Sequence, residues 1–347
     1  MVRTDTNEIR DRLERAQIRT VLAVRASRLG DLLMATPVIH AFAERWPETR
    51  LIVLTNRYSK DLLAGNEDID EVLYFDGREA DLAGRAGRRL AAGLRTRGVD
   101  LLLALRPRKE LGSFADRAAI PFLWPPEQDR GKEDEQHVVE RCFSRFAALG
   151  LMGEPGKLRL RVRDRDLLAA DDLIPPGTGP LILIHPGCDE TIRWKPRTGV
   201  RRRVWPGEHW RSLIDHLSGT ARVILSSGSR IESIWVERIL EGRRARHVSR
   251  LPLDVFPALV RRADVMITVD TGPLHIAAAI GTPLVALYGP SPVEYTGPWK
   301  ANATVLRRDL PCSPCQGKGV RCLRNVCMEE IFPGEVIAAT ERLLAGE

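Results

Sequence analysis

Short apolar runs alternate with helical patterns in two successive series, and this alternation constrains the fold more than any other feature of the chain. In the first series, strands are predicted at 20–25, 50–55, 71–75 and 99–105, with helices at 32–46 and 80–96. In the second, strands are predicted at 181–185, 222–226, 264–269 and 284–288, with helices at 207–217, 231–240, 254–261 and 274–280. Strands that alternate with helices in this way form parallel sheets covered by helices. The sequence therefore predicts an α/β protein with two doubly wound parallel-sheet domains.

A stretch rich in Gly, Pro and Asp at 153–180 separates the two series. We expect a short, exposed helical extension at 1–19, a first domain at 20–170 and a second domain at 171–347, the last with a Cys-rich tail at 312–327. The ligands of such sheets bind beyond the carboxyl ends of the strands, and in a two-domain protein the main site lies in the cleft that the domains face. The loops after Arg25, His185, Ser226 and Val269 are therefore the candidate sites.

The charge pattern limits the classes of partner. Lys and Arg number 53 against 46 Asp and Glu, and only seven of the 53 are lysine. Arginine favours bidentate contacts with phosphate or carboxylate, although most of these side chains could equally keep the surface solvated. With 5% aromatic residues and no Cys/His finger spacing, we expect no nucleic-acid partner.

Two further features concern location. No apolar run approaches the ~18 residues that a membrane span needs. The N-terminus is charged where a secretory signal would be apolar. We therefore expect a cytoplasmic protein with reduced cysteines. We also expect it to act as a monomer.

Two loops concentrate polar side chains at predicted strand ends. Asp31 opens a helix directly after the first strand, where it is either a catalytic carboxylate or an ordinary helix cap. Asp270, Thr271, Gly272 and His275 follow a later strand and open another helix. The backbone N–H groups of a helix's first turn can bind an anion, and Gly272 lets a phosphate approach closely. The alternative for this second loop is a plain helix start with a packed histidine.

Four segments together resemble glycosyltransferase family 9, whose best-known members are the ADP-heptose:lipopolysaccharide heptosyltransferases. They are the loop at 25–31, the His185-Pro-Gly187 loop, the run at 205–210 and the run at 270–290. The resemblance extends from about residue 20 to residue 340. It implies the GT-B architecture, with two Rossmann-like domains facing a cleft, an acceptor-binding N-terminal domain and a donor-binding C-terminal domain.

The resemblance assigns roles to individual residues. Asp31 matches the general base, and Ser27 and Arg106 are the expected acceptor contacts. The residues expected to bind the donor are Asp270, Thr271, Gly272, His275, Glu232, Gly187 and Arg203. Glu232 matches the acidic residue that accepts from the ribose. Arg203 stands where the family usually has a lysine, and the neighbouring cations Arg193, Lys195, Arg197, Arg201 and Arg202 are competing candidates for the diphosphate.

The implied activity is inverting transfer of heptose from ADP-heptose to an anionic glycan, a lipopolysaccharide core at the inner membrane surface. A natural-product or protein acceptor is the alternative within the family, and a non-catalytic nucleotide-sugar-binding protein is the alternative of another class. Such enzymes need no cofactor for catalysis, because protein cations and a helix N-terminus neutralise the leaving diphosphate. Peripheral attachment to the inner membrane would follow from the acceptor.

Four cysteines lie close together in the tail, at Cys312, Cys315, Cys322 and Cys327. In a reducing compartment such a cluster suggests a Zn or Fe site more readily than disulfides. A related group of protein heptosyltransferases binds iron through four cysteines, whereas many family members carry similar cysteines with no established metal. We expect free or locally packed thiols, with a structural Zn or Fe ion as the second interpretation.

Overall fold

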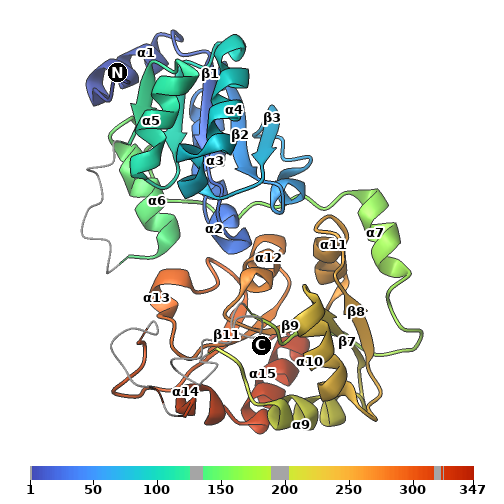
Figure 1. Cartoon of the computed structure of the whole chain (residues 1–347). Helices are drawn as coiled ribbons and strands as arrows, with labels where there is room; N and C mark the ends of the chain where they lie inside the picture. Colours follow the sequence, from blue (N-terminus) through green and yellow to red (C-terminus); the bar gives the residue numbers. More distant parts are fainter. Residues whose placement is uncertain (1, 126–135, 189–202, 316–321, 323) are drawn as a thin grey trace. The chain divides into compact units, whose positions relative to one another are not determined.

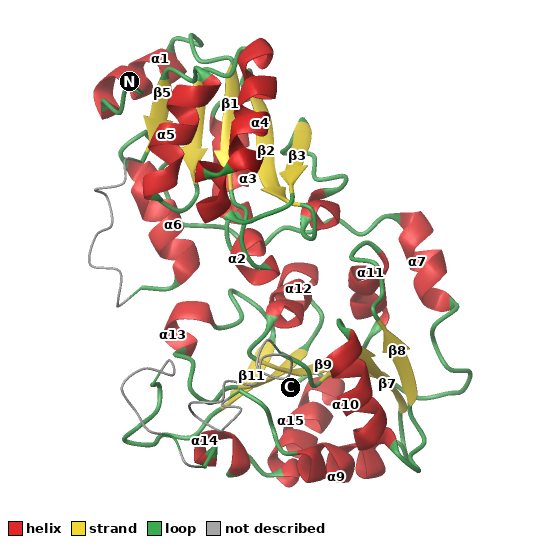
Figure 2. Ribbon diagram, in the orientation of Figure 1, coloured by secondary structure: helices red, strands yellow, loops and turns green. Residues whose placement is uncertain are grey.

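A computed structural model of the chain describes residues 2–125, 136–188, 203–315, 322 and 324–347 (Figure 1). The chain divides into two compact units, Met1–Arg161 and Val162–Glu347, and each holds one parallel sheet with helices packed against it (Figure 2). This confirms the prediction of two doubly wound α/β units. The first unit ends within the Gly-, Pro- and Asp-rich stretch that separates the two series of elements.

The sheet of the first unit has the strand order β3-β2-β1-β4-β5, and all its strands are parallel. Its strands are β1 (Thr20–Val24), β2 (Arg50–Asn56), β3 (Glu71–Phe75), β4 (Leu101–Ala104) and β5 (Phe122–Trp124). The chain runs outward from β1 in one direction and returns to β4 on its other side. Ligands of doubly wound sheets bind at such a reversal, beyond the carboxyl ends of the two central strands.

Helices cover both faces of this sheet. One face packs against α4 (Arg85–Leu94) and α5 (Lys109–Ala118), and the other against α1 (Thr6–Glu14), α3 (Thr36–Arg45) and α6 (Val138–Ala147). Shorter helical segments are α2 (Leu29–Leu33), η1 (Lys60–Leu63), η2 (Glu79–Ala83) and η3 (Arg95–Arg97). The expectation of an exposed extension at the N-terminus is wrong, because Ile9 and Leu13 of α1 are buried in the core. These two apolar residues lie four apart and so share one face of the helix.

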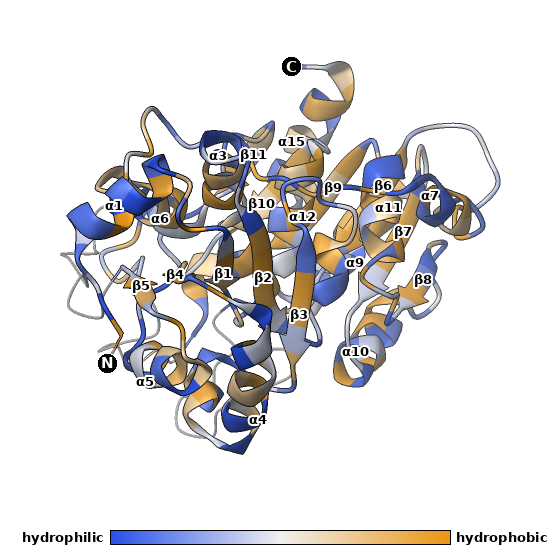
Figure 3. Ribbon diagram, turned by 90° about the horizontal axis from the view of Figure 1, so that it is seen from above, coloured by the Kyte–Doolittle hydropathy of each residue, from blue (hydrophilic) through white to orange (hydrophobic). Residues whose placement is uncertain are grey.

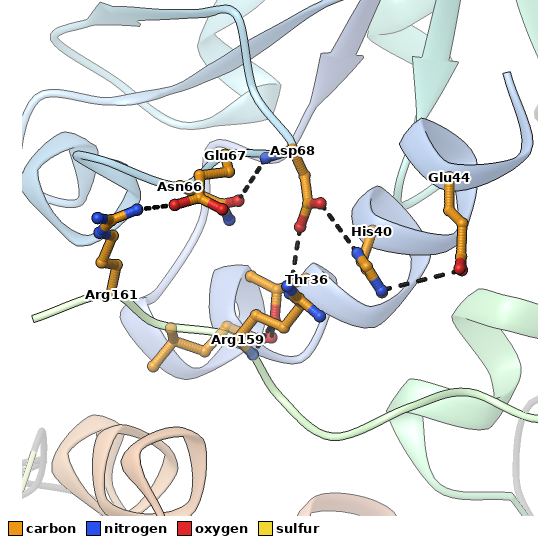
Figure 4. A network of polar contacts seen from close by, with 9 residues as sticks. Thr36, His40, Glu44, Asn66, Glu67, Asp68, Arg159 and Arg161 are labelled. Carbon is orange, nitrogen blue, oxygen red and sulfur yellow. Dashed lines mark hydrogen bonds and ion pairs between the residues drawn. The ribbon is translucent and has the colours of Figure 1, made fainter. Parts of the chain in front are cut away.

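A polar network fixes the last residues of the first unit to its core (Figure 4). The Asp68 carboxylate lies 3.2 Å from Nε of Arg159 and 2.9 Å from Nδ1 of His40. The backbone N–H of Arg159 donates to the hydroxyl of Thr36, which is buried. Arg161 pairs with Glu67. The end of the first unit is therefore held in a defined position beside α3.

The sheet of the second unit has six parallel strands in the order β11-β10-β9-β6-β7-β8. Its strands are β6 (Leu181–His185), β7 (Arg222–Ser227), β8 (Arg246–Ser249), β9 (Val265–Val269), β10 (Leu284–Leu287) and β11 (Ala303–Leu306). β6 lies between β9 and β7. The loops that follow β9, β6 and β7 therefore emerge side by side at one edge of the sheet.

One core of the second unit forms around two fully buried tryptophans. Trp205 and Trp210 pack edge to face with ring centroids 4.6 Å apart, and the indole N–H of Trp205 donates to the carbonyl of Ile331. This core is shared by α9 (Gly207–Leu217), α10 (Arg230–Leu240) and α15 (Pro333–Ala345). The other helices among the described residues of this unit are α7 (Asp164–Asp171), α11 (Val255–Arg262), α12 (Gly272–Ile280), α13 (Val293–Thr296) and α14 (Val326–Glu329). Among the helices that the structure describes, none is long and apolar enough to cross a membrane.

Candidate active site

Asp31 lies on α2, directly beyond the carboxyl end of β1. Its side chain is 26% exposed, and Oδ1 lies 3.2 Å from Nη2 of Arg25, the residue that follows the strand. Nε of Arg25 also donates to the backbone carbonyl of Asp31. The carboxylate is thus partly open to solvent and attached to a buried guanidinium, an arrangement that an ordinary helix cap does not need.

Ser27 and Arg106 lie in the two loops on either side of the reversal between β1 and β4. The loop of Ser27 is held by β2, because Asn56 donates to the carbonyl of Ser27 and Thr55 to that of Arg25. The Ser27 hydroxyl is buried and has no hydrogen-bond partner within the described residues. Desolvation and the nearby charges of Arg108 and Arg25 lower the pKa of Arg106. Three arginines therefore gather beside Asp31, which makes this edge of the sheet attractive to an anion.

In the second unit, Asp270 follows β9 and is nearly buried. Its Oδ2 accepts a hydrogen bond of 2.5 Å from the hydroxyl of Ser291 and lies 3.5 Å from Nη1 of Arg203. The same Arg203 nitrogen also lies 3.4 Å from the Asp270 carbonyl. The structure therefore brings Arg203 to the predicted donor loop. The competing cations Arg193, Lys195, Arg197, Arg201 and Arg202 lie outside the described residues.

Thr271 is the N-cap of α12, and its backbone is extended, with a φ of −158°. Gly272 is the first residue of the helix, and the cap carries no side-chain hydrogen bond. Since the cap side chain takes none of the first N–H groups, the helix N-terminus could bind an anion, chiefly through Gly272, because Pro273 has no N–H and that of Leu274 donates to the Thr271 carbonyl. His275, one turn into the helix, is 4% exposed. A ligand could therefore contact its side chain only from inside the donor site.

Glu232 is buried near the N-terminus of α10, whose N-cap is Ser229. Its Oε2 accepts from the backbone N–H of Gly228, at 2.7 Å. Gly187, in the loop after β6, lies against the same carboxylate: a Cβ atom on Gly187 would stand 2.7 Å from Cδ of Glu232. The glycine therefore makes room for the glutamate, and the two predicted donor residues are adjacent.

The predicted residues form two groups, one in each unit. Asp31, Ser27 and Arg106 gather at the β1–β4 reversal, whereas Gly187, Arg203, Glu232 and Asp270 follow the neighbouring strands β9, β6 and β7 or lie against them. Sequence reasoning missed Ser291, which lies far along the chain from Asp270 in a Pro-rich loop. It also missed Arg25 and Glu79 as members of the first group. Only Arg25, a charge at the end of an apolar strand, carried a signal that could have revealed it.

Three tail cysteines, Cys312, Cys315 and Cys322, lie near the buried Cys327. Burial raises the pKa of Cys327 to about 11, as do the neighbouring Cys322, Cys315 and Cys312. However, no group of three or more His, Cys, Asp or Glu residues is placed to hold a metal within the described ranges.

Comparison with known proteins defines the class. The protein resembles a glycosyltransferase of family 9 from Veillonella parvula, with a TM-score of 0.78 and 20% identity, covering 95% of this chain and 98% of that one. It also resembles the ADP-heptose lipopolysaccharide heptosyltransferase II of Escherichia coli, with a TM-score of 0.73 and 21% identity, covering 94% and 99% of the two chains. At these identities the likeness establishes the fold, which is the GT-B architecture of glycosyltransferases.

Sequence comparison then gives the family. The family described as glycosyltransferase family 9 (heptosyltransferase) matches residues 101–324. Lipooligosaccharide heptosyltransferase 2 of Campylobacter jejuni is 21% identical over 326 residues, which are 91% of this chain and 96% of that protein. The chain belongs to glycosyltransferase family 9 and is an enzyme of the glycosyltransferase type.

Proposed function

We propose that this enzyme transfers heptose from ADP-heptose to a hydroxyl of a lipopolysaccharide core, with inversion at the anomeric carbon. The observation that carries the proposal is the placement of Asp31. It is a partly exposed carboxylate at the reversal of the first sheet, in a chain of the family that includes the lipooligosaccharide heptosyltransferase of Campylobacter jejuni. ADP-heptose is the donor named for the heptosyltransferase of Escherichia coli, and its diphosphate would suit Arg203 and the N-terminus of α12 in the second unit.

In the proposed reaction the acceptor oxygen attacks the anomeric carbon of the heptose while its proton passes to the Asp31 carboxylate. The new bond joins that carbon to the acceptor oxygen. The bond that breaks joins the same carbon to the oxygen of the β-phosphate, and ADP leaves with the electron pair. A carboxylate can act as the base here because the proton is transferred in the transition state, while the acceptor oxygen attacks the anomeric carbon.

The second unit would hold the donor. Arg203 and the N-terminus of α12 would neutralise the charge that develops on the leaving diphosphate, and Glu232 would accept from the ribose. Because these groups are fixed before reaction, they need little reorganisation in the transition state. The proposed reaction uses no metal ion.

The first unit would hold the acceptor. Ser27 and Arg106 lie beside Asp31, and an anionic group on the acceptor would meet Arg106. A core glycan carried by lipid stays at a membrane surface. The exposed arginines of α4 would hold the enzyme against the anionic lipids of the inner membrane.

Product analysis tests the proposal. Purified enzyme is incubated with ADP-heptose and a panel of truncated core acceptors, and products are identified by mass and by anomeric configuration. We expect heptosylated core of inverted configuration, at a rate that a chelator leaves within about twofold. Asp31→Asn should lower the rate by roughly 10²- to 10⁴-fold. Transfer to a peptide or small aglycone alone, or hydrolysis without transfer, would contradict the assignment of a lipopolysaccharide core as acceptor. If no donor were turned over, the alternative of a non-catalytic nucleotide-sugar-binding protein would be favoured.

A further inference from the structure

Arg25 is a charged side chain in an almost fully buried position, 4% exposed. Burying a cation costs several kcal/mol unless opposite charges and hydrogen bonds compensate it. Here the guanidinium has a hydrogen bond at Nε and a carboxylate near each Nη atom, although Nη1 itself makes no hydrogen bond within the described residues. Nε donates to the Asp31 carbonyl, Nη2 pairs with the Asp31 carboxylate, and Nη1 lies 3.5 Å from Oε1 of Glu79. Both the backbone and the side chain of Asp31 are therefore attached to one rigid, planar group.

Glu79 is the innermost member of this group, at 2% exposed, although it comes from η2, far from Arg25 in the sequence. Two hydrogen bonds fix it to the loop after β1. Its backbone N–H donates to the carbonyl of Ala26, and its Oε1 accepts from the N–H of Ala26 at 3.2 Å. Oε2 lies 3.4 Å from Nε of Arg108. A buried carboxylate held in this way has little freedom to move.

We propose that Glu79 and Arg25 are positioning residues that set the orientation of the Asp31 carboxylate for its reaction with the acceptor. The inference rests on the proposed function, in which Asp31 is the base. Glu79 attracts one edge of the Arg25 guanidinium as an ion pair at 3.5 Å, and the opposite edge contacts Asp31. Because an arginine fork is planar, fixing one edge determines the direction of the other.

The charge balance explains why both residues are needed. Three arginines (Arg25, Arg106 and Arg108) surround two carboxylates (Asp31 and Glu79). Without the charge of Glu79, Arg25 would rest on Asp31 alone and draw its carboxylate inward, away from the acceptor. A displacement of about 1 Å at a reacting group can cost up to about 100-fold in rate.

Conservative variants separate orientation from folding. Glu79→Gln keeps the side-chain shape and an oxygen for the N–H of Ala26, but removes the charge. Arg25→Lys keeps the charge and removes the fork. For both variants we expect kcat for heptose transfer to fall about 10- to 100-fold. We expect KM for ADP-heptose to change less than twofold. The urea midpoint of Glu79→Gln should fall, because the buried Arg25 loses one of its two compensating charges, so rates are compared on preparations shown by circular dichroism to be folded. Asp76→Asn removes the exposed Arg57–Asp76 pair of the same unit and should leave kcat unchanged.

A double-mutant cycle gives the decisive comparison. If Glu79 acts through Asp31, then Glu79→Gln should cause no further loss in an Asp31→Asn background, because the base it orients is already absent. An equal loss in both backgrounds, or full kcat in Glu79→Gln, would overturn the inference while leaving Asp31 as the base. Full activity of Asp31→Asn itself would instead overturn the proposed function.

Discussion

At Gly187 the backbone passes so close to Glu232 that even one methyl group would displace the glutamate. A Cβ at this position would lie 2.7 Å from Cδ and 2.8 Å from Oε1 of Glu232. Since these are the far atoms of a flexible side chain, Gly187→Ala should move the carboxylate and leave the fold intact. We expect ADP affinity to fall about tenfold, the scale of a lost hydrogen bond to a charged group. Calorimetry with ADP measures this.

Gly207→Ala is the matched control, because a Cβ on Gly207 would meet no atom within 4 Å. It should bind ADP like the wild type. Equal affinity of Gly187→Ala and wild-type protein would remove Glu232 from the donor site.

His185 makes stability depend on pH. It is buried at the end of β6 with Nδ1 2.9 Å from the hydroxyl of Ser226, and burial lowers its pKa from 6.5 to about 4. The unfolded chain therefore takes up a proton that the folded protein refuses as the pH falls from 6.5 towards 4. The free energy of unfolding is full above pH 6.5 and decreases in this window.

The change can be isolated with a variant that does not titrate. Between pH 7 and pH 4.5 the free energy of unfolding should fall about 2 kcal/mol more in the wild type than in His185→Asn. Urea unfolding at the two pH values measures the difference. A pH dependence in His185→Asn equal to that of the wild type would contradict the assignment.

Most of the candidate residues that sequence reasoning found stand at or near strand ends, although Arg203 and the tail cysteines do not. Asp31 and Asp270 were predictable because apolar runs end beside them, and the end of a parallel strand marks the functional edge of the sheet. Glu79 and Ser291 were not predictable. Their partners, Arg25 and Asp270, lie far away in the sequence, and only the strand order β3-β2-β1 or the neighbourhood of β9 and β10 brings them together.

At the scale of single elements, α4 presents a positive face. Its ten residues include three exposed arginines (Arg85, Arg88 and Arg89) and no acidic residue. Positions 85, 88 and 89 are spaced three and four apart and so share one side of the helix. Figure 3 shows this helix with α5 along one face of the first sheet.

Replacing these three arginines by glutamine should weaken binding to vesicles that contain phosphatidylglycerol. At about 1 kcal/mol for each basic residue, the loss is on the order of 100-fold in partition coefficient. Cosedimentation measures it, and activity on a soluble acceptor should be unchanged. Glutamine at the exposed Arg238, Arg244 and Arg246 of the second unit should leave vesicle binding as it was. Equal binding by both triple variants would contradict the role of α4.

Element prediction failed where the pattern was short or polar. The helix predicted at 32–46 is divided into α2 and α3, because Pro37 has no N–H for the helix ladder and Thr36 donates its hydroxyl to the carbonyl of Leu33. β5 has only three residues, and β8 begins with the polar pair Arg246 and His247. Such edge strands gain their stability from a neighbouring strand, which a local sequence pattern does not reveal.

At the scale of the whole molecule, the two units carry separate parts of the proposed reaction. The alternation of strands and helices was sufficient to predict two sheets, because long parallel strands must be apolar on both faces. The same pattern could not place η2 beside β1. The proposed base and the residues proposed to position it lie in the first unit, and the residues proposed to bind the donor lie in the second.

This division predicts that binding and catalysis can be lost independently. Asp31→Asn should bind ADP within about threefold of the wild type and lose transfer by roughly 10²- to 10⁴-fold, because a base contributes to the chemical step and not to nucleotide affinity. Arg203→Ala should lose ADP affinity by at least about tenfold, because the lost group is a charge at the proposed diphosphate site.

Calorimetry with ADP and single-turnover transfer on the same preparations test the two halves together. Arg222→Ala removes an exposed guanidinium of the second unit, whose Nε donates to the carbonyl of Gly179, and should change neither measurement. If Asp31→Asn weakened ADP binding as much as Arg203→Ala, Asp31 would belong to the donor site, and the assignment of one role to each unit would be wrong.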